Sequence, residues 1–146
     1  MAPKFTGVLV FDENRFACGE LYCLLVAERS GLTFHNPETV DEAVDVLKRG
    51  GIEIALVNPD LPGNKGGGID FIRAHAPDFC ETRFFLHCQQ NYNEDIGKRL
   101  KEVGAVGYIR KGYTSSRQYL SAFGFTEAET NKIFGEFGPV VIFNRG

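Results

Sequence analysis

The stretch LVNPDLPGNKGG, residues 56–67, joins the end of an apolar run to a loop that is rich in glycine and polar side chains. The run IEIALVN (52–58) is almost continuously apolar, which is typical of a central parallel strand covered on both faces. Pro62 and Gly63 predict a tight turn, since both residues favour the backbone angles of turns. Asp60 supplies a carboxylate, whereas Asn58, which ends the run, supplies an amide. We therefore interpret the stretch as a strand that ends in a functional loop.

Four further short strands are predicted around this one, at residues 7–11, 32–35, 83–88 and 105–110. Helices are predicted over 15–29, 69–75, 93–103 and 114–123. A further helix opens at Thr39, which forms a capping-box pattern with Glu42, and ends at Gly50. Strand and helix alternate five times. This pattern predicts an α/β domain with a single doubly wound, five-stranded parallel sheet.

Length, charge and cysteine content exclude several classes of protein. A chain of 146 residues is long enough for one domain with a sizeable core. Its net charge is −3 and no dense run of Lys or Arg occurs, so the sequence does not support binding to nucleic acid or to an anionic membrane. No apolar stretch approaches the length of a membrane span, and the N-terminus lacks a signal-peptide core. The four cysteines lack zinc-ligand spacing and are expected to be reduced thiols in a cytoplasmic protein.

Polar side chains follow four of the predicted strands, at the edge where such sheets carry their functional crevice. They are Asp12 and Glu13 after the first strand, Asn58 after the third, Cys88 at the fourth and Lys111 after the fifth. Two adjacent acids can share a divalent cation, because hard cations prefer carboxylate oxygens. A lysine at the same edge can neutralise a phosphoryl group. Taken alone, Asp12 and Glu13 are better explained as caps of the following helix and Lys111 as a solvated charge, but the set on one sheet edge points to one site.

Three motifs in this arrangement resemble the receiver domain of bacterial response regulators, the CheY-like family: VLVFDEN in the first strand, LVNPDLPG in the third and GYIRK in the fifth. The resemblance covers residues 6–123 and implies the strand order 2-1-3-4-5. It places the acidic pair that holds Mg²⁺ in this family on Asp12 and Glu13. It also places the conserved-type lysine on Lys111 and the aromatic switch position on Tyr108.

The departures from the family pattern are as informative as the matches. The position of the phosphoacceptor aspartate is Asn58, the hydroxyl residue of the fourth strand is Cys88, and the proline after the lysine is Gly112. An amide lacks the nucleophilic carboxylate oxygen that phosphoryl transfer requires. Losing a negative ligand also weakens the cation site, so we expect no cofactor beyond a weak or absent Mg²⁺ site. The resemblance is therefore to a degenerate pseudo-receiver, which is not an enzyme.

Three functional hypotheses follow. The first is a phosphorylation-independent signalling module that binds proteins in a two-component pathway, with a histidine kinase or an output protein as its partner. The second is an active response regulator that uses Asp60 or another acid as phosphoacceptor. The third is a small flavodoxin-like protein that binds a nucleotide or flavin.

The C-terminal extension, residues 124–146, is the least family-like part of the chain. Thr126 and Glu129 form a second capping-box pattern, which predicts a short helix to about Phe134. The apolar run GPVVIF (138–143) has no partner in the five-stranded sheet. It either folds back on its own domain or adds a strand to a dimer or a partner complex.

In receivers, the surface of the fourth helix, fifth strand and fifth helix reports the state of the pocket. With phosphorylation lost, we expect Tyr108 to hold one position. We predict that this surface mediates self-association or partner docking, with the apolar tail contributing. The predicted surface residues are Ile96, Leu100, Tyr108, Arg110, Tyr113 and Tyr119, and the tail residues are Ile133, Phe134, Val140 and Ile142.

Overall fold

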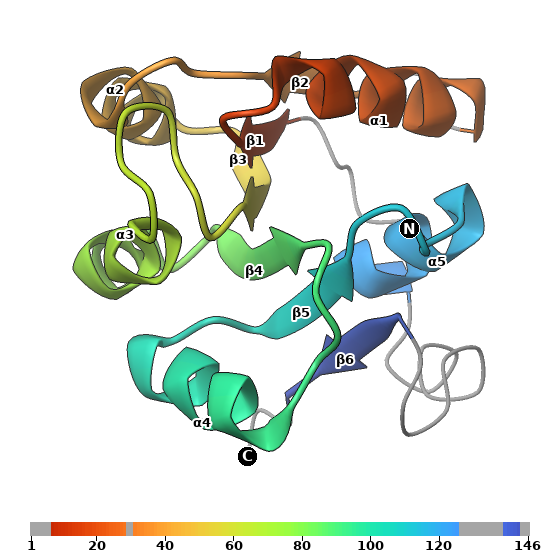
Figure 1. Ribbon diagram of the computed structural model, residues 1–146. Coiled ribbons are helices and arrows are strands. Elements are labelled where there is room, and N and C mark those ends of the chain that lie inside the picture. Colours follow the sequence, from red (N-terminus) through yellow and green to blue (C-terminus); the bar gives the residue numbers. More distant parts are fainter. Residues whose placement is uncertain (1–6, 29–30, 126–138, 144–146) are drawn as a thin grey trace.

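One six-stranded sheet, with helices on both faces, organises the chain (Figure 1). The computed structural model describes residues 7–28, 31–125 and 139–143. Five strands are parallel: β1 (Gly7–Phe11), β2 (Thr33–His35), β3 (Ile52–Val57), β4 (Arg83–Cys88) and β5 (Gly107–Arg110). The sixth strand, β6 (Val140–Ile142), runs antiparallel beside β5, which gives the order β2-β1-β3-β4-β5-β6.

The helices divide between the two faces of the sheet (Figure 1). On one face lie α2 (Val40–Arg49), α3 (Gly68–His75) and α4 (Glu94–Val103), and the short 3₁₀ helix η1 (Ala76–Asp78) follows α3. On the other face lie α1 (Arg15–Glu28) and α5 (Ser116–Leu120), and α5 continues as a π-helical turn, η2 (Ser121–Phe125). Among the described residues, no helix is long and apolar enough to cross a membrane.

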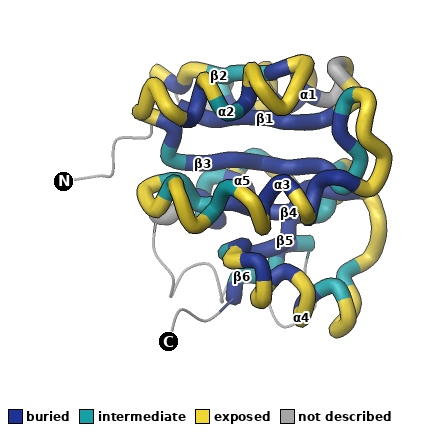
Figure 2. The backbone as a smooth tube through the Cα atoms, turned by 90° about the vertical axis from the view of Figure 1, so that its left-hand side faces the viewer, coloured by how far each residue is buried: buried dark blue, intermediate teal, exposed yellow. Residues whose placement is uncertain are grey.

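Alternation along each strand creates two separate cores, one on each face of the sheet. Leu9 and Phe11 of β1 face the helices α2, α3 and α4, whereas Val8 and Val10 face α1 and α5. The same period of two holds in β4 and over residues 54–57 of β3, since successive side chains of a strand point to opposite faces. Figure 2 shows β1 and β3 buried along their lengths, while the helices keep exposed residues on their outer sides. The continuous apolar character of β3 thus reflects burial on both faces, as predicted.

The capping pattern at Thr39 opens a helix, but its hydrogen bonds differ in one detail from those predicted. Thr39 Oγ1 accepts from the backbone N–H of Glu42 at 3.1 Å. The Glu42 carboxylate accepts from the N–H of Glu38 at 2.8 Å, one residue before the N-cap. The full reciprocal pair occurs instead at α5, between Ser115 and Gln118.

The predicted order 2-1-3-4-5 is confirmed for the parallel strands, but the predicted count of five strands is wrong. The apolar run at residues 138–143 supplies the sixth strand by pairing with the edge of β5. It therefore folds back on its own sheet. The predicted helix between Thr126 and Phe134 lies outside the described residues.

Candidate functional site

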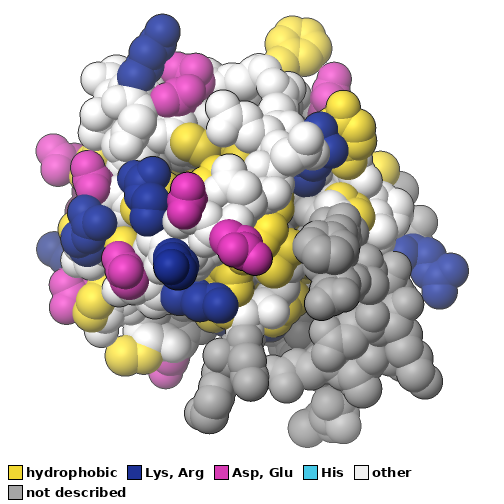
Figure 3. Space-filling model, turned by 60° about the horizontal axis from the view of Figure 1, so that its bottom comes forward, with side chains coloured by type: hydrophobic (Ala, Val, Ile, Leu, Met, Phe, Trp, Pro, Cys, Tyr) yellow, Lys and Arg dark blue, Asp and Glu magenta, His cyan; other side chains and the backbone are white. Residues whose placement is uncertain are grey.

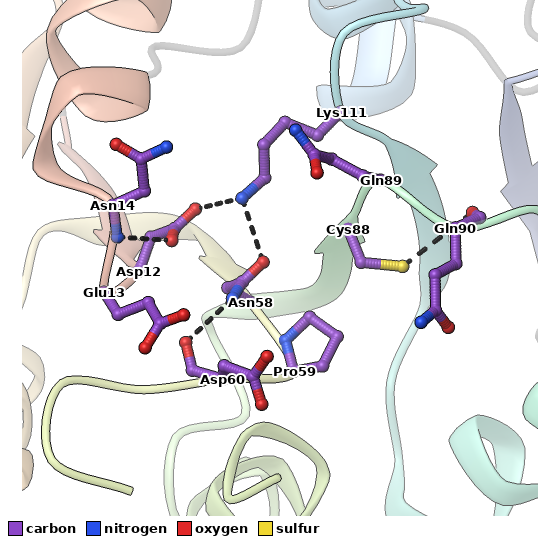
Figure 4. Close-up of a pocket in the computed structure, with 10 residues that line it drawn as sticks. All are labelled: Asp12, Glu13, Asn14, Asn58, Pro59, Asp60, Cys88, Gln89, Gln90 and Lys111. Carbon is purple, nitrogen blue, oxygen red and sulfur yellow. Dashed lines mark hydrogen bonds and ion pairs between the residues drawn. The ribbon is translucent and has the colours of Figure 1, made fainter. Parts of the chain in front are cut away.

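The carboxyl ends of the parallel strands meet at a cavity of about 210 Å³ (Figure 4). Asp12 and Glu13 follow β1, Asn58 follows β3, Cys88 ends β4 and Lys111 follows β5. The crevice of an open α/β sheet is expected at this edge, where the polar ends of neighbouring strands converge. The residues that line the cavity are Asp12, Glu13, Asn14, Asn58, Pro59, Asp60, Cys88, Gln89, Gln90 and Lys111.

A half-buried lysine joins two of the strand ends. Lys111 Nζ donates to Asp12 Oδ2 and, at 2.9 Å, to Asn58 Oδ1 (Figure 4). The Lys111 side chain is 14% exposed and that of Asp12 is 1% exposed, so this ion pair is largely shielded from water. Two of the three ammonium protons are thereby used. The ammonium group supplies the positive charge that balances Asp12 inside the cavity.

The amide of Asn58 is fixed at both ends. Its Oδ1 accepts from Lys111, and its Nδ2 donates to the backbone carbonyl of Asp60 at 2.8 Å. The second bond requires a donor, which an ionised aspartate at this position does not have. Asn58 therefore ties the end of β3 to the following loop in a way that the carboxylate could not reproduce.

The loop after β3 is held by further hydrogen bonds. Asp60 Oδ1 accepts from the N–H of Gly66 at 2.8 Å, and the N–H of Gly68 donates to the carbonyl of Pro59 at 2.9 Å. A Cβ at Gly68 would collide with the backbone of Asn58 and would lie 2.8 Å from Pro59 Cα. A glycine is thus needed where α3 begins beneath the site.

The residues present do not fit a resident Mg²⁺ ion. Asp12 Oδ2 is paired with Lys111, and Asp12 Oδ1 accepts from the N–H of Asn14 at 2.9 Å. The carbonyl of Asp60 accepts from Asn58, and Glu13 is exposed at the rim. Within the ranges that the structure describes, no group of three or more His, Cys, Asp or Glu side chains is placed to hold a metal ion.

Cys88 lines the cavity and contacts Tyr108, which lies behind it in the core. Cys88 Sγ lies 3.3 Å from Tyr108 Oη, and both side chains are buried. Burial, followed by the bond to Cys88, raises the pKa of Tyr108 above its ordinary value, so the phenol is protonated at neutral pH. Tyr108, for which the resemblance implies a switch role, thus points inward and is fixed by a polar contact.

Behind the site, a histidine and a tyrosine meet on the other face of the sheet. His87 Nε2 lies 2.6 Å from Tyr119 Oη, and both side chains are buried. Burial, with a smaller contribution from the charge of Lys111, lowers the pKa of His87 to about 3. His87 is therefore neutral at pH 7. The sequence pattern did not reveal this pair, because the two residues are 32 positions apart and no local signal links them.

The surface predicted for docking is less exposed than expected. Leu100, Tyr108 and Tyr119 are buried, so the expectation that they lie on the surface is wrong. Tyr113 is 62% exposed, and the Arg110 guanidinium stacks over its ring at 3.7 Å. The remaining predicted residues fall into three groups: half-buried Ile96 and Ile142, buried Val140, and Ile133 and Phe134, which lie outside the described residues.

No family model matches the sequence, and no curated protein matches it. Solved structures are similar in fold. A CheY-like response regulator receiver domain protein from Methanospirillum hungatei JF-1 is 17% identical, with a TM-score of 0.68 over 89% of this chain and 99% of that chain. A response regulator from Burkholderia pseudomallei, solved with a phosphorylated aspartic acid, a calcium ion and citrate, is 20% identical, with a TM-score of 0.70 over 88% of this chain and 72% of that chain.

The signal receiver domain of a modulated diguanylate cyclase from Desulfovibrio desulfuricans G20 is 19% identical, with a TM-score of 0.67 over 89% of this chain and 99% of that chain. At these identities the likeness is one of fold. The parallel strand order and the helices on both faces agree with it. The chain has the α/β fold of CheY-like response-regulator receiver domains.

Proposed function

We propose that this chain is a receiver-like signalling module that acts by binding other proteins and does so without being phosphorylated. The observation that carries the proposal is the state of Asn58. It stands where receivers carry the acceptor aspartate, and both ends of its amide are bonded, to Lys111 and to the carbonyl of Asp60. Formation of an acyl phosphate needs a carboxylate oxygen as nucleophile, and the amide has none.

The charge balance of the cavity supports the same function. In a phosphorylated receiver the lysine neutralises the phosphoryl group. Here the Lys111 ammonium already pairs with Asp12, and the cavity has no fitting set of ligands for Mg²⁺. A site that is neutralised by its own residues needs neither the cation nor the phosphoryl group to be stable. We infer a non-enzymatic, cytoplasmic protein whose output depends on its surface rather than on chemistry at the cavity.

The competing hypotheses gain less support from the geometry. The Asp60 carboxylate is turned to the loop, where it accepts from the N–H of Gly66. The cavity at the strand ends, of about 210 Å³, lies below the roughly 300 to 1,000 Å³ of most ligand pockets, which does not favour a nucleotide or flavin bound within this cavity. The partner class that we propose is a protein of a two-component pathway, either a histidine kinase or an output protein.

Incubation with acetyl phosphate and Mg²⁺, followed by intact-protein mass spectrometry, tests the proposal. We expect no phosphoryl adduct on the parent chain, and an adduct on Asn58→Asp, which restores the carboxylate in the same frame. Asp60→Asn is the matched variant for the competing acceptor. A stoichiometric adduct on the parent that disappears in Asp60→Asn would show that the chain is an active phosphoacceptor. An adduct that Asp60→Asn retains would also refute the proposal and would place the acceptor on another acid.

A further inference from the structure

The edge of β5 is occupied by the chain's own C-terminal strand. β6 pairs with β5 in antiparallel register, with Tyr108 opposite Val141. At one end of the pair, the N–H of Arg110 donates to the backbone carbonyl of Pro139 at 2.7 Å. At the other end, the N–H of Phe143 donates to the backbone carbonyl of Val106 at 2.9 Å. This edge would otherwise present unpaired backbone groups, which are a ready template for another strand. In this structure, residues 139–143 form hydrogen bonds with the backbone groups along this edge.

The approach of β6 to β5 is close. At Gly107, which lies opposite Ile142, a Cβ would lie 2.5 Å from the carbonyl oxygen of Val141 and 3.2 Å from side-chain atoms of Ile142 and Phe85. A glycine in a strand interior often marks such a close approach of another backbone. The sequence of β5 is thus matched to β6 as its neighbour.

The side chains of β6 divide between the two cores. Val140 and Ile142 pack with the core on the side of α1 and α5. Val141 and Phe143 pack with the core on the side of α4, which contains Tyr108. This division follows from the alternation of side chains along a strand. β6 therefore contributes side chains to both cores and forms the new edge of the sheet.

Phe143 completes a cluster of aromatic rings around Tyr108. The Tyr92 ring lies 5.4 Å from that of Tyr108 and 6.4 Å from that of Phe143. Lys101 of α4 places its ammonium group 5.4 Å from the Phe143 ring. Tyr108 is fully buried, with its hydroxyl bonded to Cys88. Val141, which is paired with Tyr108, and Phe143 thus pack into the same core as the Tyr108 ring at the edge of β5.

We propose that the edge of β5 is a strand-docking surface whose resting occupant is β6, and that β6 holds Tyr108 inward until it is displaced. This inference rests on the proposed function, because it names the surface through which the module would bind. The partner that fits is an extended, apolar segment that pairs antiparallel with β5 and places a large apolar side chain where Phe143 lies.

The charge on the neighbouring surface agrees with this class of partner. α4 carries three acidic and three basic residues, in the sequence EDIGKRLKEV. Figure 3 shows Lys and Arg side chains interspersed with Asp and Glu on the face that includes α4. Such a surface offers no single-sign field to attract a highly charged ligand. Backbone pairing and apolar contacts are what this edge provides.

The buried thiols of the chain allow a direct test in the full-length protein. Replacing the two exposed cysteines, Cys23→Ser and Cys80→Ser, leaves Cys18 and Cys88 as the buried thiols. Cys88 contacts Tyr108 in the core on the side of α4 and also lines the cavity, whereas Cys18 lies in the core on the opposite face of the sheet. Because access through the cavity is common to the parent and to a β6 variant, an increase in the Cys88 labelling rate over that of the parent reports displacement of Tyr108, and an increase at Cys18 reports general loosening.

In this background, Phe143→Ala removes a ring of β6 that packs against Tyr92 in the core that holds Tyr108, and Phe79→Ala is the control in another part of the same core. We expect Phe143→Ala to raise the labelling rate of Cys88 at least tenfold, with Cys18 unchanged, and Phe79→Ala to leave the ratio of the two rates unchanged. Amide hydrogen exchange at Arg110, whose N–H donates to Pro139, should accelerate in the same variant. Unchanged rates at Cys88 and Arg110 would overturn the proposal.

Two further measurements complete the test. If Phe143→Ala raises the labelling rate of Cys18 as much as that of Cys88, the variant has loosened the whole protein. Val141→Ala, which truncates only the side chain opposite Tyr108, then replaces it, and a selective rise in the labelling rate of Cys88 is again the expected result. The peptide GPVVIFN, which has the sequence of residues 138–144, is the docking probe, and a scrambled peptide is its control. It should bind the Phe143→Ala chain at least tenfold more tightly than the parent. Equal binding, or none, would refute the docking surface. These readouts involve no phosphodonor, so their failure is distinct from that of the proposed function.

Discussion

His87 makes the stability of this protein depend on pH in a predictable direction. Its imidazole is buried at the carboxyl end of β4, and it faces the hydroxyl of Tyr119 on α5 and the charge of Lys111. Burial first, and Lys111 second, lower its pKa from 6.5 to about 3. The folded protein thus keeps His87 neutral at pH values where the unfolded chain binds a proton.

The sign and size of the effect follow from this difference. The contribution is fully present above about pH 6.5 and is lost as the pH falls toward about 3, because the unfolded state binds one more proton in that window. The free energy of unfolding should fall by about 1.4 kcal/mol for each pH unit well inside the window. Between about pH 7.5 and about pH 5, the contribution of His87 sums to about 2 kcal/mol.

Urea unfolding, monitored by circular dichroism at several pH values, measures the contribution of His87 to the free energy of unfolding. The variant His87→Gln keeps a polar side chain and does not titrate, so it should lose the 2 kcal/mol difference between the two pH values. Tyr119→Phe should lower stability by a similar amount at each pH and keep the parent's pH dependence, because burial is the main cause of the shift. Carboxylates that titrate in the same range contribute equally to the free energy of unfolding of the variant and of the parent, so their contribution cancels in the difference at each pH.

A parent and a His87→Gln variant with parallel pH dependences, to within about 0.5 kcal/mol, would refute the reasoning. Such a result would mean that His87 is protonated in the folded protein, or that water reaches it. In either case the assignment of a neutral, buried imidazole bonded to Tyr119 would be wrong.

Two further predictions concern the site and the helices that support it. Lys111→Met should cost about 3 to 5 kcal/mol in urea unfolding, because it leaves a buried carboxylate uncompensated. Arg73→Met, which breaks an exposed pair on α3, should cost less than about 1 kcal/mol, and equal costs would contradict the burial of the site. Gly19→Ala on α1, where a Cβ meets nothing within 4 Å, should stabilise by about 0.5 to 1 kcal/mol. Gly97→Ala on α4 should not stabilise the protein, because the added Cβ would collide with the Tyr92 hydroxyl. Equal melting temperatures of the two variants would contradict this packing.

The sequence by itself determined the parallel part of the fold and the place of the site. The apolar runs of β1 and β3, the cap at Thr39 and the glycines after the helices are local signals, and each specifies an element within a few residues. Alternation of strand and helix then leaves few topologies, all of which bring the strand ends to one edge. The contact between Lys111 and Asp12, 99 positions apart in the chain, follows from that constraint.

Only the tertiary structure decided what lies beside β5. The three residues of β6 carry the same short apolar pattern as several other segments, and pairing with β5 is set by contacts more than 30 positions away in the sequence. A local pattern holds no information on which edge is free, or on whether the pair is parallel or antiparallel. The burial of Tyr108 and the bond between His87 and Tyr119 depend on the same non-local contacts. Exposure and pairing are properties of the assembled sheet, because each requires side chains from several elements to meet in space.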